Sequence, residues 1–383
     1  MKKLPNDWAV FVVSIFCSVA LRWTLFDFET GDFRGTQKPW FDIMLATGRF
    51  KSLADHFSNY PPLYLYFLAL ASWLPISALY ALKTVYIAFD YVLAAYVYAI
   101  VKLKYSSGAL PLVSFLSIIF LPTVFINSAM WCQCDAMYTS AMVACLYYLL
   151  KKCHLKALIA LGIAFSLKPQ AGFLGPLVLT LAIRRQFSYF SLYVIPVTYL
   201  VASMPALIAG RPLSEILFLY TDQPIQPFPS LTLGATNLYQ WLSDAHFQML
   251  FHAGLVLAAW VILLFIWLIA REAKRELFAE DLVGLAILST LLFPYVLPTM
   301  HERYFFPADV FSVIYAFYLP SKYYYALLVQ MCSLFTYLPY LIGKEPLPRP
   351  YLALVLGLVL LLISKDMVVR LCRTSETPRE GLP

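Results

Sequence analysis

The sequence predicts an all-α fold, a polytopic bundle of membrane-spanning helices, on three observations. Of the 383 residues, 61% are hydrophobic and only 13% are charged, whereas about a quarter of the residues of a soluble domain are charged. The mean hydropathy is +0.73. Apolar runs of roughly 17 to 25 residues recur along the chain, and each is long enough to cross about 30 Å of hydrocarbon. A soluble globular protein is therefore excluded.

The charged residues exclude one further class of partner. The chain has 28 Lys and Arg against 21 Asp and Glu, a net charge of +7, but it contains no basic run of the kind that binds nucleic acid. The expected partner is the lipid bilayer, with no nucleic acid. Lys2 and Lys3 precede the apolar segment 8–26, which is too long for a signal-peptide core and lacks a small-residue cleavage site. We expect this segment to be a retained helix.

Orientation follows from Lys and Arg near helix ends, because positively charged flanks stay on the cytoplasmic side. The basic clusters are Lys2/Lys3, Lys102/Lys104, Lys151/Lys152/Lys156, Arg184/Arg185, Arg271/Lys274/Arg275, Lys322 and Arg370/Arg373. The expected spans are 8–26, 77–101, 109–128, 135–151, 155–167, 171–184, 188–209, 249–270, 281–299, 304–320, 323–342 and 350–369. We therefore expect about twelve crossings, which form one transmembrane domain, 1–383. This domain is expected in the cytoplasmic (inner) membrane, with both termini in the cytoplasm.

Residues 60–75 are apolar but do not fit as a crossing, because counting them would place a basic cluster on the wrong face. We expect a re-entrant or interfacial helix on the outer side, opened by Pro61 and Pro62, which suit a first helical turn.

Segments 155–167 and 171–184 are short and are separated by Lys168-Pro169, which predicts a bent pair. Irregular backbone at membrane depth occurs where protein buries it or water lines it, so 60–75 and this pair are both expected cavity walls.

The first outer loop, 27–59, carries two candidate bases, Glu29 and Asp32, in a setting that also contains Arg34, Lys38 and Trp40. A carboxylate at the outer end of a helix, beside aromatic and basic residues, is suited to general-base catalysis. The alternative is a solvated loop carboxylate. Helical spacing would put Glu29 and Asp32 on one face, but the intervening glycine favours a turn, so the residues alone do not decide between them.

Two further segments place polar groups at span mouths. Gln133 and Asp135 lie at an outer boundary, with Asp135 at a helix N-terminus, where helix capping is the alternative role. Lys168 lies outside the cytoplasmic clusters and is expected to be an exposed point charge for a phosphate. Its alternative role is a snorkelling side chain.

His301, Glu302 and Arg303 open a span at the outer face, and ionisable groups at such depth are functional candidates. His301 and Arg303 can donate to phosphate oxygens, and Glu302 can orient one of them. Carboxylates, cations and aromatics on one face suit a transferase whose donor is a lipid phosphate, because the cations offset the charge that develops on the leaving phosphate.

Metal and disulfide chemistry are not expected. The five His and seven Cys show no metal-ligand spacing, and a bridge between Cys132 and Cys134 would be strained. These cysteines are expected to be packed thiols. The outer loop 211–248 is Pro-rich and aromatic, so it is either a lid over an acceptor or a connector between helices.

Several different short motifs follow one another along the chain. They are Gly31-Asp32-Phe33 through Pro39-Trp40-Phe41, Tyr60-Pro61-Pro62-Leu63-Tyr64, Trp131-x-Gln133-x-Asp135-Ala136-x-Tyr138-Thr139, Lys168-Pro169-Gln170 and His301-Glu302-Arg303-Tyr304. At these segments the sequence resembles the GT-C superfamily of integral-membrane glycosyltransferases, and within it the bacterial proteins similar to GPI mannosyltransferases. Many of those relatives have Gly where this chain has Cys132.

The resemblance implies a polyprenyl-phosphate sugar donor, a mannose-like hexose, an active site facing outside and inverting direct displacement onto a lipid, glycan or protein acceptor. It places the catalytic base on Asp32, with Glu29 tuning it. Asp135 then joins the catalytic group. The substrate contacts are Arg34, Lys38, Trp40, Tyr60, Gln133, Lys168, His301, Glu302, Arg303 and Tyr304.

No cofactor is expected, because the first loop has no DxD-type carboxylate pair, which argues against an obligatory divalent metal. The alternative function is a transporter or flippase of a lipid-linked sugar. Transporters often have pseudo-symmetric halves with matching broken helices, whereas 60–75 and 155–184 both lie in the N-terminal half. This favours the enzyme.

Overall fold

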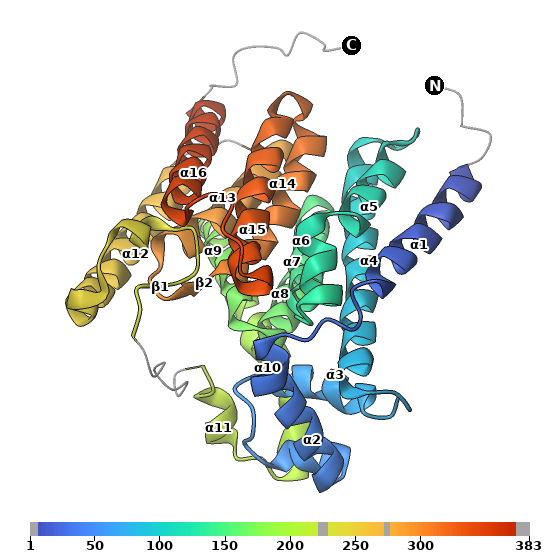
Figure 1. The fold of residues 1–383 in the computed structure, drawn as a ribbon. Coiled ribbons are helices and arrows are strands. Elements are labelled where there is room, and N and C mark those ends of the chain that lie inside the picture. Colours follow the sequence, from blue (N-terminus) through green and yellow to red (C-terminus); the bar gives the residue numbers. More distant parts are fainter. Residues whose placement is uncertain (1–6, 221–228, 272–275, 373–383) are drawn as a thin grey trace. The chain divides into compact units, whose positions relative to one another are not determined.

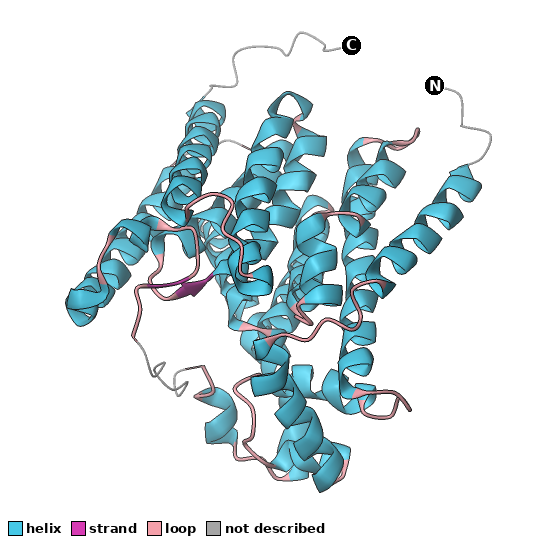
Figure 2. Ribbon diagram, in the orientation of Figure 1, coloured by secondary structure: helices cyan, strands magenta, loops and turns pink. Residues whose placement is uncertain are grey.

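The computed structural model describes residues 7–220, 229–271 and 276–372. The predicted all-α class is confirmed, because most of these residues are helical and the two strands are two residues long each (Figures 1 and 2). The elements are α1 (Asp7–Trp23), η1 (Phe33–Gln37), α2 (Lys38–Thr47), η2 (Arg49–Ala54), α3 (Pro62–Ala71), α4 (Ala78–Lys104), α5 (Leu110–Ile119), α6 (Pro122–Phe125), η3 (Ile126–Met130), α7 (Asp135–Leu150), α8 (His154–Leu167), η4 (Pro169–Leu174), α9 (Gly175–Ile183), η5 (Tyr189–Tyr193), α10 (Val194–Ala209), α11 (Leu213–Leu217), β1 (Thr232–Leu233), η6 (Leu238–Trp241), η7 (Asp244–His246), α12 (Phe247–Ala270), α13 (Ala279–Val296), β2 (Met300–His301), η8 (Glu302–Phe305), α14 (Phe306–Tyr318), η9 (Pro320–Lys322), α15 (Tyr323–Ile342) and α16 (Arg349–Cys372).

The chain forms two compact units. Unit 1 comprises Met1–Gly172, Phe190–Pro229 and Tyr337–Lys344, and unit 2 comprises Phe173–Tyr189, Ser230–Thr336 and Glu345–Pro383. The basic residues expected at 2, 3, 274, 275 and 373 lie outside the described residues.

The protein is a multi-pass membrane protein. The expectation of about twelve crossings is not supported. Among the described residues, 6 helices are long and apolar enough to span: Ala78–Lys104, Tyr189–Ala209, Asp244–Ala270, Ala279–Val296, Pro320–Ile342 and Arg349–Cys372. The count reaches 7 if the pair Leu110–Ile119 and Pro122–Met130, bent by 42°, forms one span.

The overcount arises because apolar sequence continues where the surroundings are protein rather than lipid. Every expected segment contains a helix, but α7 has 16 residues, α8 has 14 and α14 has 13. At about 1.5 Å per residue, these helices fall short of about 30 Å of hydrocarbon. Nearly every side chain of α14 is buried, which explains a helix that is apolar all round. By contrast, α12 exposes large apolar side chains, including Trp260, Leu263 and Trp267.

The two irregular segments have the expected local form. Helix α3 has 10 residues, about 15 Å, which is too short for a crossing. Helix α8 ends at Leu167, and Lys168 is extended with φ −160° and ψ 141°, as expected for a residue before proline.

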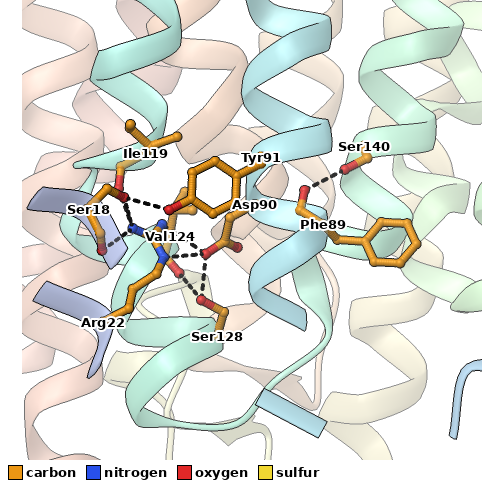
Figure 3. A network of polar contacts seen from close by, with 9 residues as sticks. All are labelled: Ser18, Arg22, Phe89, Asp90, Tyr91, Ile119, Val124, Ser128 and Ser140. Carbon is orange, nitrogen blue, oxygen red and sulfur yellow. Dashed lines mark hydrogen bonds and ion pairs between the residues drawn. The ribbon is translucent and has the colours of Figure 1, made fainter. Parts of the chain in front are cut away.

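A buried ion pair, absent from the sequence-based expectations, holds α1 against α4 in unit 1 (Figure 3). Arg22 donates from Nε and Nη2 to Oδ2 of Asp90, at 3.1 and 2.9 Å, and from Nη1 to the carbonyl of Ile119 at 2.8 Å. Nη1 also donates to Oγ of Ser18 at 2.5 Å, and Ser128 donates to the same Asp90 oxygen at 2.6 Å. Both charges are almost fully buried, and this pairing offsets the cost of removing them from water.

Lys83 of α4 fixes the start of the loop 27–59. Its ammonium donates to the carbonyls of Leu25, Phe26 and Phe28, at 2.8 to 2.9 Å. These carbonyls lie in the turn that follows α1, and their hydrogen bonds offset the cost of burying the ammonium. The backbone that leads to Glu29 is thereby held in place.

Candidate functional site

Two π-helical turns frame the site in unit 1. Turn η1 begins directly after Asp32, and turn η3 ends directly before Trp131. Such turns are rare and occur frequently at functional sites. Both therefore mark the region where the loop 27–59 contacts the 131–133 turn.

The Asp32 carboxylate is the centre of this meeting place. Its Oδ2 accepts hydrogen bonds from Nε2 of Gln133 at 2.7 Å and from Nε1 of Trp131 at 3.1 Å. Its backbone N–H donates to the hydroxyl of Tyr340 at 2.8 Å, and the Tyr340 ring stacks on Trp131 at 4.8 Å. Asp32 itself is only half-buried. The carboxylate is thus oriented by donors while it keeps access to solvent.

Two further bonds fasten the loop to the same turn. Thr30 donates from Oγ1 to the carbonyl of Trp131 at 3.0 Å, and Gln37 donates from Nε2 to the carbonyl of Cys132 at 2.7 Å. Bonds on both sides of Asp32 limit the positions that its carboxylate can take.

Asp135 and Lys168 form a buried ion pair in the same unit. Nζ of Lys168 lies 2.5 Å from Oδ1 of Asp135, and Nδ2 of Asn127 donates to Oδ2 of Asp135 at 2.8 Å. The side chains of Asp135 and Lys168 are 0% and 3% exposed. The expectation of an exposed lysine is therefore wrong, because the ammonium needs the carboxylate once it is buried. Asp135 is the first residue of α7, but the residue at the cap position is Cys134.

Two tyrosine rings lie beside this ammonium, and a tryptophan packs on one of them. Nζ of Lys168 lies 5.5 Å from the ring centre of Tyr60 and 5.6 Å from that of Tyr138, and the Tyr60 ring lies 5.2 Å from that of Trp40. Cation–π contact adds to the ion pair. The predicted residues Trp40, Tyr60 and Lys168 are thus brought together.

Exposed surface ion pairs, rather than buried contacts, engage Glu29, Arg34 and Lys38. Glu29 pairs with Arg34 at 2.8 Å, and Lys38 pairs with Asp42 at 2.6 Å. All four side chains are at least 40% exposed, and surface pairs of this kind contribute about 0–1 kcal/mol. Of the two candidate bases, only Asp32 is held in a defined orientation by buried groups.

Amide oxygens near both carboxylates lack hydrogen-bond donors. The side-chain oxygens of Gln37, Asn127 and Gln133 are buried without a partner within the described part of the chain. Each amide nitrogen is engaged by Cys132, Asp135 or Asp32, respectively, which fixes the oxygen on the other side. A buried acceptor without a donor costs about 1–3 kcal/mol, so these oxygens are suited to ligand hydroxyls. Sequence reasoning missed Gln37 and Asn127, although a polar Asn127 inside an expected span was a usable signal.

Cys132 lies in the turn between the two carboxylates with φ 63°, in the left-handed region that L-residues disfavour by roughly 1–2 kcal/mol. Cys132 and Cys134 are free thiols, as expected, and burial raises the pKa of the Cys132 thiol, which stays protonated. The position where many members of the resembled family have Gly therefore adopts a backbone that suits Gly.

This geometry predicts an unusual order of stabilities at position 132. Cys132→Ala and Cys132→Gly both lose the packed sulfur, but only glycine relieves the left-handed conformation, by up to about 1 kcal/mol. The glycine variant is expected to melt at a higher temperature than the alanine variant, although its side chain is smaller. Thermal unfolding of the two detergent-solubilised proteins checks this, and a higher melting temperature for the alanine variant would contradict it.

His301, Glu302, Arg303 and Tyr304 lie in unit 2. Strand β2 pairs in parallel with β1, with His301 in register with Leu233. Nδ1 of His301 lies 3.7 Å from Oε2 of Glu302, and the rings of His301 and Tyr304 are 5.3 Å apart. Glu302 is buried, whereas His301, Arg303 and Tyr304 are half-buried.

The absence of a side chain at Gly234 leaves room for the carboxylate of Glu302. A Cβ at Gly234, whose φ is +88°, would lie 3.1 Å from Oε2 of Glu302 and 3.5 Å from Nη1 of Arg349. Arg349 therefore belongs to the surroundings of this carboxylate, and the sequence analysis did not single it out.

The expected outer loop 211–248 is divided between the units at Pro229 and Ser230. Its Pro-rich residues 221–228 lie outside the described residues. In unit 2, Asn237 donates from Nδ2 to the carbonyls of Pro294 and Leu297, both at 3.3 Å, and Tyr239 donates to Val296 at 2.8 Å. This part of the loop is fixed, and a lid role for the remainder stays a prediction.

No group of three or more His, Cys, Asp or Glu that could hold a metal ion occurs among the described residues. Comparison of the sequence with protein-family models and with curated proteins finds no match. The resemblance to the GT-C superfamily thus stands on the motifs given above.

Proposed function

We propose that this protein is a membrane glycosyltransferase that moves a monosaccharide, a mannose-like hexose, from a polyprenyl-phosphate donor to an acceptor hydroxyl. The observation that carries the proposal is the half-buried Asp32 carboxylate, oriented by Trp131 and Gln133. A general base needs this combination of fixed geometry and access to the proton that it removes.

The reaction is a single displacement. Asp32 takes the proton of the acceptor hydroxyl while the hydroxyl oxygen bonds to the anomeric carbon of the sugar. The bond from that carbon to the phosphate oxygen breaks, and its electron pair leaves with the polyprenyl phosphate. Attack opposite to the leaving group inverts the anomeric configuration, so a β-linked donor gives an α-linked product.

The surroundings of Asp32 support a hydroxyl-rich substrate. The partnerless oxygens of Gln37, Asn127 and Gln133 can accept hydrogen bonds from sugar hydroxyls. The Asp135–Lys168 pair is internally neutral, so its role in this proposal is to position the start of α7 and the aromatic residues. His301 and Arg303 of unit 2 remain the proposed phosphate contacts from the sequence motif. The active site is proposed to face away from the cytoplasm, with both termini inside.

The experiment that tests the proposal separates transfer from transport. Purified protein in vesicles is given a polyprenyl-phosphate sugar labelled in the sugar, with simple alkyl mannosides as acceptors. A glycosyltransferase releases free polyprenyl phosphate and forms a labelled glycoside. Movement of intact donor across the bilayer, without cleavage of the sugar–phosphate bond, would instead identify the transporter alternative.

A further inference from the structure

Arg211 is a buried arginine in unit 1 whose guanidinium pairs only loosely with a carboxylate. It follows Gly210, the left-handed residue that ends α10, and its side chain is 0% exposed. Within the described part of the chain, Nε, Nη1 and Nη2 have no hydrogen-bond partner. The carboxylate of Glu215 is 3.6 Å from Nε, beyond hydrogen-bond distance. This buried cation therefore retains its donors.

A second buried arginine in the same unit shows what a structural role requires. Arg22 uses all three side-chain nitrogens, with Asp90, Ser18 and the Ile119 carbonyl as partners. Buried charges are normally paired and hydrogen-bonded, because leaving water is otherwise costly. Arg22 meets that condition and Arg211 does not, although the two are buried to the same degree.

The groups around Arg211 are largely aromatic. The electrostatic neighbours of its guanidinium are Glu215, Tyr199 and Tyr66. Both tyrosine hydroxyls donate to backbone carbonyls, Tyr199 to Ile216 at 2.8 Å and Tyr66 to Ala202 at 2.9 Å. Burial lowers the pKa of the Arg211 guanidinium, and Glu215 opposes this shift. Arginine nevertheless remains charged in proteins.

Glu215 lies at the solvent side of this group. Its carboxylate is 36% exposed, and His56, which is 42% exposed, lies 3.9 Å away. Because Glu215 approaches Nε, the planar Nη1–Nη2 end of the guanidinium is the part that is buried without a partner among the described residues. That end matches two oxygens of a phosphate group.

We propose that Arg211 binds the phosphate group of a ligand through Nη1 and Nη2, in a site that opens to admit the phosphate. Lys168, assigned to this task from the sequence, already carries a bound carboxylate at 2.5 Å. A phosphate would supply the hydrogen-bond acceptors that Arg211 lacks among the described residues. The phosphate chemistry follows from the guanidinium alone, whereas its identification with a polyprenyl phosphate rests on the proposed function.

The test compares two arginine-to-methionine variants of the full-length, detergent-solubilised protein. Without ligand, Arg211→Met is expected to melt at or above the wild-type temperature, because it removes a charge that has no hydrogen bond. Arg22→Met, the matched control, is expected to melt at a clearly lower temperature, because it leaves Asp90 buried without its cation. A fall for Arg211→Met as large as that for Arg22→Met would make Arg211 structural and would overturn the proposal.

Ligand binding supplies the second readout. A short-chain polyprenyl phosphate is expected to raise the wild-type melting temperature, and Arg211→Met is expected to lose this shift and to weaken binding by at least about tenfold. Inorganic phosphate is the parallel probe, and the polyprenyl alcohol is the control. A shift with both phosphates indicates a general phosphate site, and a shift with the lipid alone indicates a lipid headgroup. Equal shifts with the alcohol, or an undiminished shift in Arg211→Met, would overturn the proposal.

The outcome for Arg211 is independent of the outcome for sugar transfer. Wild-type protein that binds phosphate through Arg211 but cleaves no sugar donor would disprove the proposed function and leave the phosphate site standing. Protein that transfers sugar, but whose phosphate binding is unaffected by Arg211→Met, would disprove the phosphate site and leave the proposed function standing.

Discussion

Asp32→Asn is expected to lower sugar transfer by about 10²–10⁴-fold, the contribution of a positioned general base, while the protein remains folded. The amide is close in shape to the carboxylate, and its oxygen can still accept the hydrogen bonds that Trp131 and Gln133 donate. It cannot take a proton from the acceptor. The measurement is the rate of labelled product formation, with the melting temperature of the same sample as the test of folding.

Glu29→Gln is the matched control for this substitution. The substitution removes only the exposed ion pair between Glu29 and Arg34, which contributes about 0–1 kcal/mol to stability. The rate of sugar transfer and the stability are therefore expected to change little. If Asp32→Asn kept wild-type activity while Glu29→Gln lost it, the two assignments would have to be exchanged. If neither variant lost activity, no base would lie in the first loop.

Lys168→Met is expected to destabilise unit 1 by about 3–5 kcal/mol, because it leaves the fully buried Asp135 carboxylate without its cation. The double substitution Lys168→Met with Asp135→Asn removes both charges and is expected to recover most of that loss. Nδ2 of Asn127 can still donate a hydrogen bond to the side-chain oxygen of the amide that replaces the Asp135 carboxylate. The measurement is a double-mutant cycle on the free energy or temperature of unfolding.

A double variant no more stable than Lys168→Met would contradict this account of the pair. It would mean that the lysine stabilises α8 and its surroundings through contacts other than the carboxylate. Lys38→Met, which removes an exposed partner of Asp42, is the control and is expected to leave stability nearly unchanged.

The location of the helices was predictable from the sequence, but their role in the membrane was not. Hydropathy reports that a segment avoids water, and it cannot distinguish surrounding lipid from surrounding protein. Helix α14, buried on nearly every side, and helix α12, with Trp260 and Trp267 exposed, are both strongly apolar in sequence. Only the structure distinguishes them.

The site was predictable in part. The short motifs singled out Asp32, Gln133, Asp135 and Lys168 as separate candidates, and the structure places Asp32 in contact with Gln133 and Asp135 in contact with Lys168. The burial of Lys168 was not predictable, because it depends on a partner 33 positions away. Arg22 and Asp90, 68 positions apart, were overlooked inside expected spans for the same reason. The lack of hydrogen bonds to Arg211 from the residues that the structure describes is likewise a property of its packed surroundings.

The π-turn η3 has a consequence for how this chain can vary. Its successive residues Asn127 and Ser128 serve different ion pairs, since Asn127 binds Asp135 and Ser128 binds Asp90. Successive side chains on a helix differ in direction by about 100°, so the loss or gain of a single residue in this turn would rotate one of the two partners away from its carboxylate. The length of this segment is therefore constrained by two ion pairs at once.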